Sequence, residues 1–216
     1  MKRIFGLGSP LVENLSTIGD VICASALWIV FSLPVFTMGA ANVALYTTVN
    51  RCMRQNKPGI WKHFWQSFRD NFKVATIAWI VELLVMAVLT LDTLVFRGMW
   101  IRGDGMGGLY WVALLFWLVA LTWLAYVAAY TARFTGRVRD VLYFALLFLR
   151  LHPLYTLGMM LLITAGLALC LMAPVLVLFA PAGLCWVSTF LIERVFRLHM
   201  RPEDLAKETG GLPDKK

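Results

Sequence analysis

The stretch KVATIAWIVELLVMAVLTLDTLVF, residues 73–96, decides the fold class of this chain. It carries charged side chains only at Lys73, Glu82 and Asp92, and it is longer than the roughly 20 residues that an α-helix needs to cross a bilayer. The sequence therefore predicts an all-α, polytopic integral membrane protein with about five transmembrane helices. The other predicted spans are residues 15–34, 109–132, 154–172 and 176–198.

The amino-acid composition agrees with a membrane protein. The 216 residues are 60% hydrophobic and 15% charged, whereas soluble domains average about 45–50% apolar and about 25% charged residues. A soluble protein with large buried helices is the alternative, but so few polar residues would not cover several apolar runs. The net charge of +8 is explained by the Lys and Arg residues that membrane proteins place in cytoplasmic loops, so we expect no nucleic-acid partner.

Three shorter segments, residues 39–54, 59–72 and 137–150, are predicted to be amphipathic helices on the cytoplasmic side. Within 59–72, the aromatic residues share one helical face by i, i+3 and i+4 spacing, which is typical of a helix that lies in the bilayer interface. The alternative is an amphipathic helix packed against a partner. We expect a single helical membrane domain over residues 1–200, followed by a polar cytoplasmic tail over residues 201–216.

The positions of the basic residues predict the orientation in the membrane. With the N-terminus outside, most of the 20 Lys and Arg residues fall on the cytoplasmic side, as the positive-inside rule requires. Lys2 and Arg3 would then lie outside, which argues against this orientation. On balance we expect an outside N-terminus and a cytoplasmic C-terminus.

Glu82 is the candidate functional residue within a membrane span. At 1.5 Å per residue, its separation from Lys73 places it about 13 Å deep, near the midplane of a hydrocarbon core about 30 Å thick. A charge at that depth is costly, so such residues usually face a cavity, a partner or a proton path. We expect Glu82 to be protonated or hydrogen-bonded to a neighbouring helix. Two interpretations stay open: substrate or proton handling, and a hydrogen bond that only packs helices.

The known catalytic and ligand-binding motifs give little support for an enzyme. The glycines of residues 103–108 satisfy GxGxxG, but that motif binds a dinucleotide only between a strand and a helix, so we interpret it as a turn. P-loop, HExxH and GxSxG patterns are absent, and the three histidines lack metal-ligand spacing. We therefore expect no catalytic residue, no metal, no cofactor and no enzymatic activity.

The segment LPVFTMGAANVALY, residues 33–46, interrupts the apolar pattern. Pro34 is expected to end one helix, and the Thr37 hydroxyl to cap the next by accepting a backbone N–H. Gly39 and the two following alanines leave room for close helix packing, and Asn42 is expected near the water-accessible surface. The segment therefore predicts a structural corner more readily than a ligand site.

The same segment and the one that follows it resemble the YesL-like family of bacterial integral membrane proteins. The resemblance covers about residues 12–96 well, because the P-x-x-T-x-G-A-A break and the F-x-x-S-F-x-x-N-F helix occur together and in order. The matching or neighbouring positions that we single out as family-signature or structural residues are Pro34, Thr37, Gly39, Asn42, Tyr46, Phe64, Phe68, Asn71 and Phe72.

This resemblance implies a location and a role, but no site. The family is a domain of unknown function, located in the bacterial plasma membrane, whose members are often encoded beside carbohydrate uptake genes. It implies an accessory or regulatory component of carbohydrate uptake, with the lipid bilayer and subunits of a transport system as partners. The alternative is a small secondary transporter that uses Glu82 as its intramembrane carboxylate.

Overall fold

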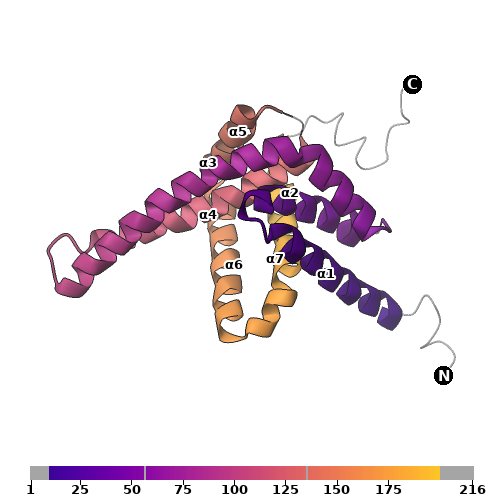
Figure 1. The fold of residues 1–216 in the computed structure, drawn as a ribbon, viewed down its shortest axis with the longest axis horizontal. Coiled ribbons are helices and arrows are strands. Elements are labelled where there is room, and N and C mark those ends of the chain that lie inside the picture. Colours follow the sequence, from indigo (N-terminus) through magenta and orange to yellow (C-terminus); the bar gives the residue numbers. More distant parts are fainter. Residues whose placement is uncertain (1–9, 56, 135, 200–216) are drawn as a thin grey trace.

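The computed structural model describes residues 10–55, 57–134 and 136–199, which are mostly helical and contain no β-strand (Figure 1). This confirms the all-α prediction for the described residues. The α-helices are α1 (Pro10–Ser32), α2 (Met38–Thr48), α3 (Ile60–Arg102), α4 (Leu109–Arg133), α5 (Val138–Leu151), α6 (Pro153–Met172) and α7 (Ala180–His199). Shorter helical turns cover Val35–Thr37, Val49–Arg54 and Pro174–Leu178.

Among the described residues, three helices, α3, α4 and α6, are long and apolar enough to cross a membrane. Helix α1 contributes the shorter apolar segment Gly19–Ser32. Figure 1 shows α1, the α3–α4 hairpin and the α6–α7 hairpin as three arms that leave the region around α2. The α3–α4 loop forms the free end of one arm at the far left, and the start of α1 and the α6–α7 turn form the free ends of the other two arms in the lower half of the view.

Helix α3 joins two elements that the sequence predicts separately, the interfacial helix at 59–72 and the span at 73–96. The joint contains neither proline nor glycine, so nothing interrupts the backbone hydrogen bonds. Gly59 (φ 102°) precedes the helix and Gly103 (φ 76°) ends it, both in the left-handed region that favours glycine. At 1.5 Å per residue the helix is about 65 Å long, roughly twice the hydrocarbon thickness. One continuous helix can therefore supply both the span and the interfacial segment.

Helix α2 differs most from its predicted environment. Residues 39–54 were expected on the membrane surface, whereas α2 is almost wholly buried and contacts α1, α3, α4 and α7. The cause is the row of small residues that opens the helix. A Cβ added at Gly39 would lie 2.4 Å from the Cβ of Trp79 and 2.6 Å from the carbonyl oxygen of Ala75. Only glycine permits α2 and α3 to approach this closely.

The second half of the chain follows the predicted order. Helices α4, α5 and α6 lie close to the predicted segments 109–132, 137–150 and 154–172. Helix α7 begins at Ala180 instead of residue 176, because Pro174–Leu178 forms a separate 3₁₀ turn. The predicted polar tail lies outside the described residues.

Candidate functional site

The corner between α1 and α2 is closed by the side chain of Thr37. Its hydroxyl lies 2.6 Å from the carbonyl oxygen of Phe31, in the last turn of α1, and 2.7 Å from that of Pro34, which follows the helix. The predicted cap on the next helix is wrong, because the Thr37 side chain makes no cap hydrogen bond with α2. Carbonyls in the last turn of a helix lack intrahelical partners, and Pro34 has no N–H to offer them. Thr37 therefore stabilises the end of the preceding helix.

Two tryptophans hold the same corner from neighbouring helices. Trp79 Nε1 of α3 donates to the carbonyl oxygen of Val35 at 2.7 Å, and Trp28 Nε1 of α1 donates to Oδ1 of Asn42 at 2.7 Å. Asn42 is half-buried and lines a mostly apolar cavity of about 380 Å³ that α1, α2, α4, α6 and α7 enclose. It thus contacts a space between helices, whereas the sequence predicted a position near the water-accessible surface.

Glu82 lies on the face of α3 that packs against α2 and α4, and it is 3% exposed. It lines a cavity of about 10 Å³, together with Asn42 of α2 and Thr131 of α4. Such a volume has room for a single water at most. The Oε1 atom of Glu82 has no hydrogen-bond partner among the described residues. The structure thus brings the predicted intramembrane carboxylate and the corner amide of Asn42 to one place.

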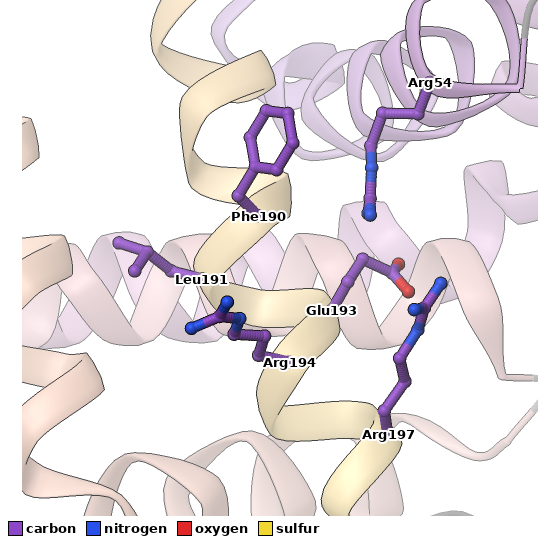
Figure 2. A pocket seen from close by; sticks show the side chains of 6 residues that line it. All are labelled: Arg54, Phe190, Leu191, Glu193, Arg194 and Arg197. Carbon is purple, nitrogen blue, oxygen red and sulfur yellow. The ribbon is translucent and has the colours of Figure 1, made fainter.

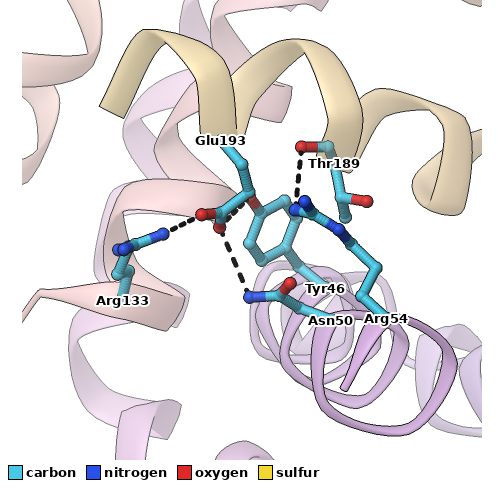
Figure 3. A network of polar contacts seen from close by, with 6 residues as sticks. All are labelled: Tyr46, Asn50, Arg54, Arg133, Thr189 and Glu193. Carbon is cyan, nitrogen blue, oxygen red and sulfur yellow. Dashed lines mark hydrogen bonds and ion pairs between the residues drawn. The ribbon is translucent and has the colours of Figure 1, made fainter. Parts of the chain in front are cut away.

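A second buried carboxylate, Glu193 of α7, was not predicted as a site residue. It is 2% exposed, and its side chain points into a polar network (Figure 3). The hydroxyl of Tyr46 donates to Oε1 at 3.0 Å, and Nδ2 of Asn50 donates to the same oxygen at 3.3 Å. The guanidinium of Arg133 forms an ion pair with Oε2. One carboxylate therefore connects α2, the turn after it, α4 and α7.

Tyr46 is suited to this donor role. Burial raises the pKa of its phenol above the ordinary value, an effect that Cys185 reinforces and that Arg133 and Arg54 oppose. The phenol therefore keeps its proton and donates to the carboxylate at physiological pH. A hydrogen bond to a charged group is stronger than one between neutral groups, and it also satisfies an oxygen that would otherwise be buried without a partner.

Arg54 extends the network along α7. Its Nη1 donates to the carbonyl oxygen of Thr189 at 3.4 Å, and its guanidinium lies 5.1 Å from the ring centroid of Phe190. Figure 2 shows Arg54, Glu193 and Arg197 around a common space beside α7. This cavity measures about 260 Å³. A neighbouring cavity of about 290 Å³ is lined by Tyr46, Thr47, Asn50, Arg51, Gln55, Ala132 and Arg133.

The aromatic residues of the first part of α3 divide between two environments. Phe64 and Phe68 are buried and contact Phe31 of α1, with ring centroids 5.4 and 5.0 Å apart. Phe72 is partly exposed and lies against Phe68, at 5.4 Å between centroids. Asn71 Nδ2 donates to the carbonyl oxygen of the residue four positions earlier, at 3.1 Å. Phe64 and Phe68 therefore pack α3 against α1, whereas these contacts of Asn71 and Phe72 lie within α3.

The described residues contain no group of three or more His, Cys, Asp or Glu side chains placed to hold a metal ion. The polar groups that do converge are one carboxylate, one phenol, one amide and several guanidinium groups. This arrangement can bind anions or hold helices together.

A comparison with family models identifies one similarity. The family described as "Protein of unknown function, DUF624" matches residues 21–93, from α1 into α3. The match includes the corner, α2 and Glu82, whereas Arg133 and Glu193 lie outside it. No curated protein and no solved structure gave a significant match.

Proposed function

We propose that the chain crosses a bacterial plasma membrane about five times, through α1, α3, α4, α6 and α7, with its N-terminus outside. Large apolar side chains are exposed along the arms, as lipid contact requires. In Figure 1 the α6–α7 turn and the start of α1 lie in the lower half of the view, whereas α5 lies at the top. Arg133 is the last residue of α4 and Arg197 lies in the last turn of α7, and basic residues at these helix ends are expected for a cytoplasmic side.

Cysteine labelling tests this topology. In a background without the native cysteines, Gly105→Cys in the α3–α4 loop is expected to react with an impermeant maleimide on intact cells. Gly136→Cys between α4 and α5 is expected to react only after permeabilisation. The reverse pattern would overturn the orientation, and reaction of both positions on intact cells would overturn the span count.

We further propose that the protein is an accessory component of a carbohydrate uptake system. Support comes from the resemblance to the YesL-like family, which lies in the same region that the DUF624 model matches. The structural observation that favours a docking role is an exposed aromatic pair at the start of α3. Trp61 and Trp65 stack with ring centroids 6.2 Å apart and an interplanar angle of 1°, and both face outward. Exposed stacked tryptophans are suited to contacts with a partner protein or with the bilayer interface.

The test is chemical cross-linking in native membranes, followed by purification and identification of bound proteins. We expect a permease, ATPase or binding-protein subunit of a carbohydrate transporter to be recovered with the wild type. The double variant Trp61→Ala/Trp65→Ala is expected to lose this subunit. Trp100→Ala/Trp111→Ala is the matched control, because these tryptophans, at the end of α3 and the start of α4, are also exposed and in contact. Recovery of no transporter subunit, or equal loss in both variants, would overturn the proposal.

A small secondary transporter is the second candidate, and the environment of Glu82 favours it. A buried carboxylate with an unpartnered oxygen beside Asn42 and Thr131 is suited to taking up and releasing a proton. The small volume of its cavity argues that another conformation would be needed to admit a substrate.

Proton flux in liposomes tests the transporter. An entrapped pH indicator is expected to report sugar-dependent proton movement that Glu82→Gln abolishes. Asp92→Asn is the control, because Asp92 is an exposed acid on the same helix. Flux that persists in Glu82→Gln, or no flux with any sugar tested, would leave the accessory role as the sole proposal.

A further inference from the structure

Three of the residues that line the cavity beside α7 are arginines. The cavity measures about 260 Å³ and lies against the turn Val49–Arg54 (Figure 2). Its lining residues are Arg54, Phe190, Leu191, Glu193, Arg194 and Arg197. Five of these six residues are contributed by one face of α7, where positions three and four apart are neighbours.

The charges around this cavity do not balance. Glu193 is its single carboxylate, and that carboxylate already forms an ion pair with Arg133 and accepts bonds from Tyr46 and Asn50. Arg194 and Arg197 are exposed, and no described carboxylate lies within ion-pair distance of either guanidinium. In Figure 2 the guanidinium groups of Arg194 and Arg197 extend to opposite sides of α7, and an anion bound between them would be attracted by both charges.

We propose that this cavity binds a phosphate-bearing anion. The planar guanidinium fork matches phosphate oxygens in bidentate geometry, so Arg194 and Arg197 are the expected ligands, with Arg54 as the inner wall. Arg54 is oriented for this by its contact with Thr189 and by the Phe190 ring. Phe190 and Leu191 supply an apolar side that suits the start of an acyl or organic group. The cavity volume of about 260 Å³ suits a small head group and is below the range of about 300–1,000 Å³ that is usual for pockets that bind larger ligands.

Two sources can supply this chemistry: the head group of an anionic phospholipid and free inorganic phosphate. Basic pockets between transmembrane helices on the cytoplasmic side are a recurrent head-group site. The proposal is independent of any association with carbohydrate uptake, because it rests only on the cavity and its charges.

The experiment compares Arg194→Gln/Arg197→Gln with the control Arg137→Gln/Arg139→Gln. The control removes the same charge from exposed residues at the start of α5. In the first arm, native mass spectrometry measures how much phosphatidylglycerol the purified protein retains from an equal mixture with phosphatidylcholine. In the second arm, calorimetry measures binding of inorganic phosphate to the protein in phosphatidylcholine nanodiscs.

The site variant is expected to lose about tenfold or more of the binding in at least one arm, because two charge-assisted contacts are removed. The control is expected to change by less than about twofold in the same arm. A selective loss in the first arm identifies a lipid, and a selective loss in the second identifies a free anion. Equal losses in both variants would show general attraction to a basic surface and overturn the proposal. Unchanged binding in the site variant, or no binding in either arm, would overturn it as well.

Discussion

The phenol of Tyr46 donates a hydrogen bond of 3.0 Å to the carboxylate of Glu193, although the two residues are 147 positions apart in the chain. Both are buried, at 3% and 2% exposure. Arg133 of α4 forms an ion pair with the same carboxylate. The carboxylate therefore has partners on two helices besides its own, and the loss of one partner is expected to affect the packing of all three.

Tyr46→Phe tests the hydrogen bond. The ring is kept and only the hydroxyl is lost, so we expect the free energy of unfolding to fall by about 1.5–3 kcal/mol, the range for a bond to a charged group. Equilibrium unfolding of the purified protein in detergent measures this change. Tyr143→Phe is the control, because that tyrosine is exposed and its loss is expected to stay within about 0.5 kcal/mol. Similar losses in both variants would show that the Tyr46 hydroxyl does not stabilise the fold.

A double-mutant cycle on Arg133 and Glu193 tests the ion pair. Arg133→Gln alone and Glu193→Gln alone are each expected to lower the free energy of unfolding by about 3–5 kcal/mol, because the remaining buried charge loses its partner. The double variant is expected to cost clearly less than the sum of the two. Unfolding midpoints and slopes in detergent give the coupling energy. Losses that add within about 0.5 kcal/mol would show that the two residues act independently.

Gly39 and Gly98 give opposite predictions for one substitution. At Gly39 a new Cβ would lie 2.4 Å from Trp79 Cβ, so Gly39→Ala is expected to destabilise the protein by about 1–3 kcal/mol or more through overpacking. At Gly98, inside α3, a new Cβ meets nothing within 4 Å. Gly98→Ala is therefore expected to stabilise the protein by up to about 1 kcal/mol, because alanine has a higher helix propensity than glycine. Thermal unfolding of both variants checks the signs, and a neutral Gly39→Ala would contradict the close contact of α2 and α3.

The sequence predicted the helices well because apolar length and periodicity are local properties. The depth of Glu82 could be read in the same way, from its distance to Lys73 along one helix. The neighbours of Glu82 could not be predicted from the sequence, because Asn42 and Thr131 come from α2 and α4 and approach Glu82 only in the folded chain. Glu193 was missed for a related reason. It stands among arginines near a helix end, where a charge normally costs little, and its burial depends on residues far away in sequence.

Thr37 shows how a local prediction can identify the right residue and the wrong bond. The hydroxyl was expected to accept a backbone N–H of α2, but it donates to the carbonyl oxygens of Phe31, in the last turn of α1, and of Pro34, which follows that helix. Thr37→Val is expected to destabilise the protein by about 1 kcal/mol, and Thr37→Ser to retain most of the stability. Chemical denaturation of both variants measures the difference. Equal losses in Val and Ser variants would show that the methyl group, not the hydroxyl, closes the corner.

His63 is expected to make stability depend on pH. Partial burial, followed by the positive charges of Arg51, Lys62 and Lys57, lowers the pKa of His63 below its ordinary value of 6.5, against a smaller opposing effect of the backbone at Pro58. Above pH 6.5 the imidazole is mostly neutral in both states, so its contribution is constant. As the pH falls below 6.5, the unfolded chain binds the proton more readily than the folded protein, and stability decreases. The measurement is the difference in unfolding free energy between wild type and His63→Gln at about pH 7.5 and about pH 5.5, in which contributions from other groups cancel. The wild type should lose more stability than the variant on acidification, and an equal or smaller loss would show that folding does not lower the pKa of His63.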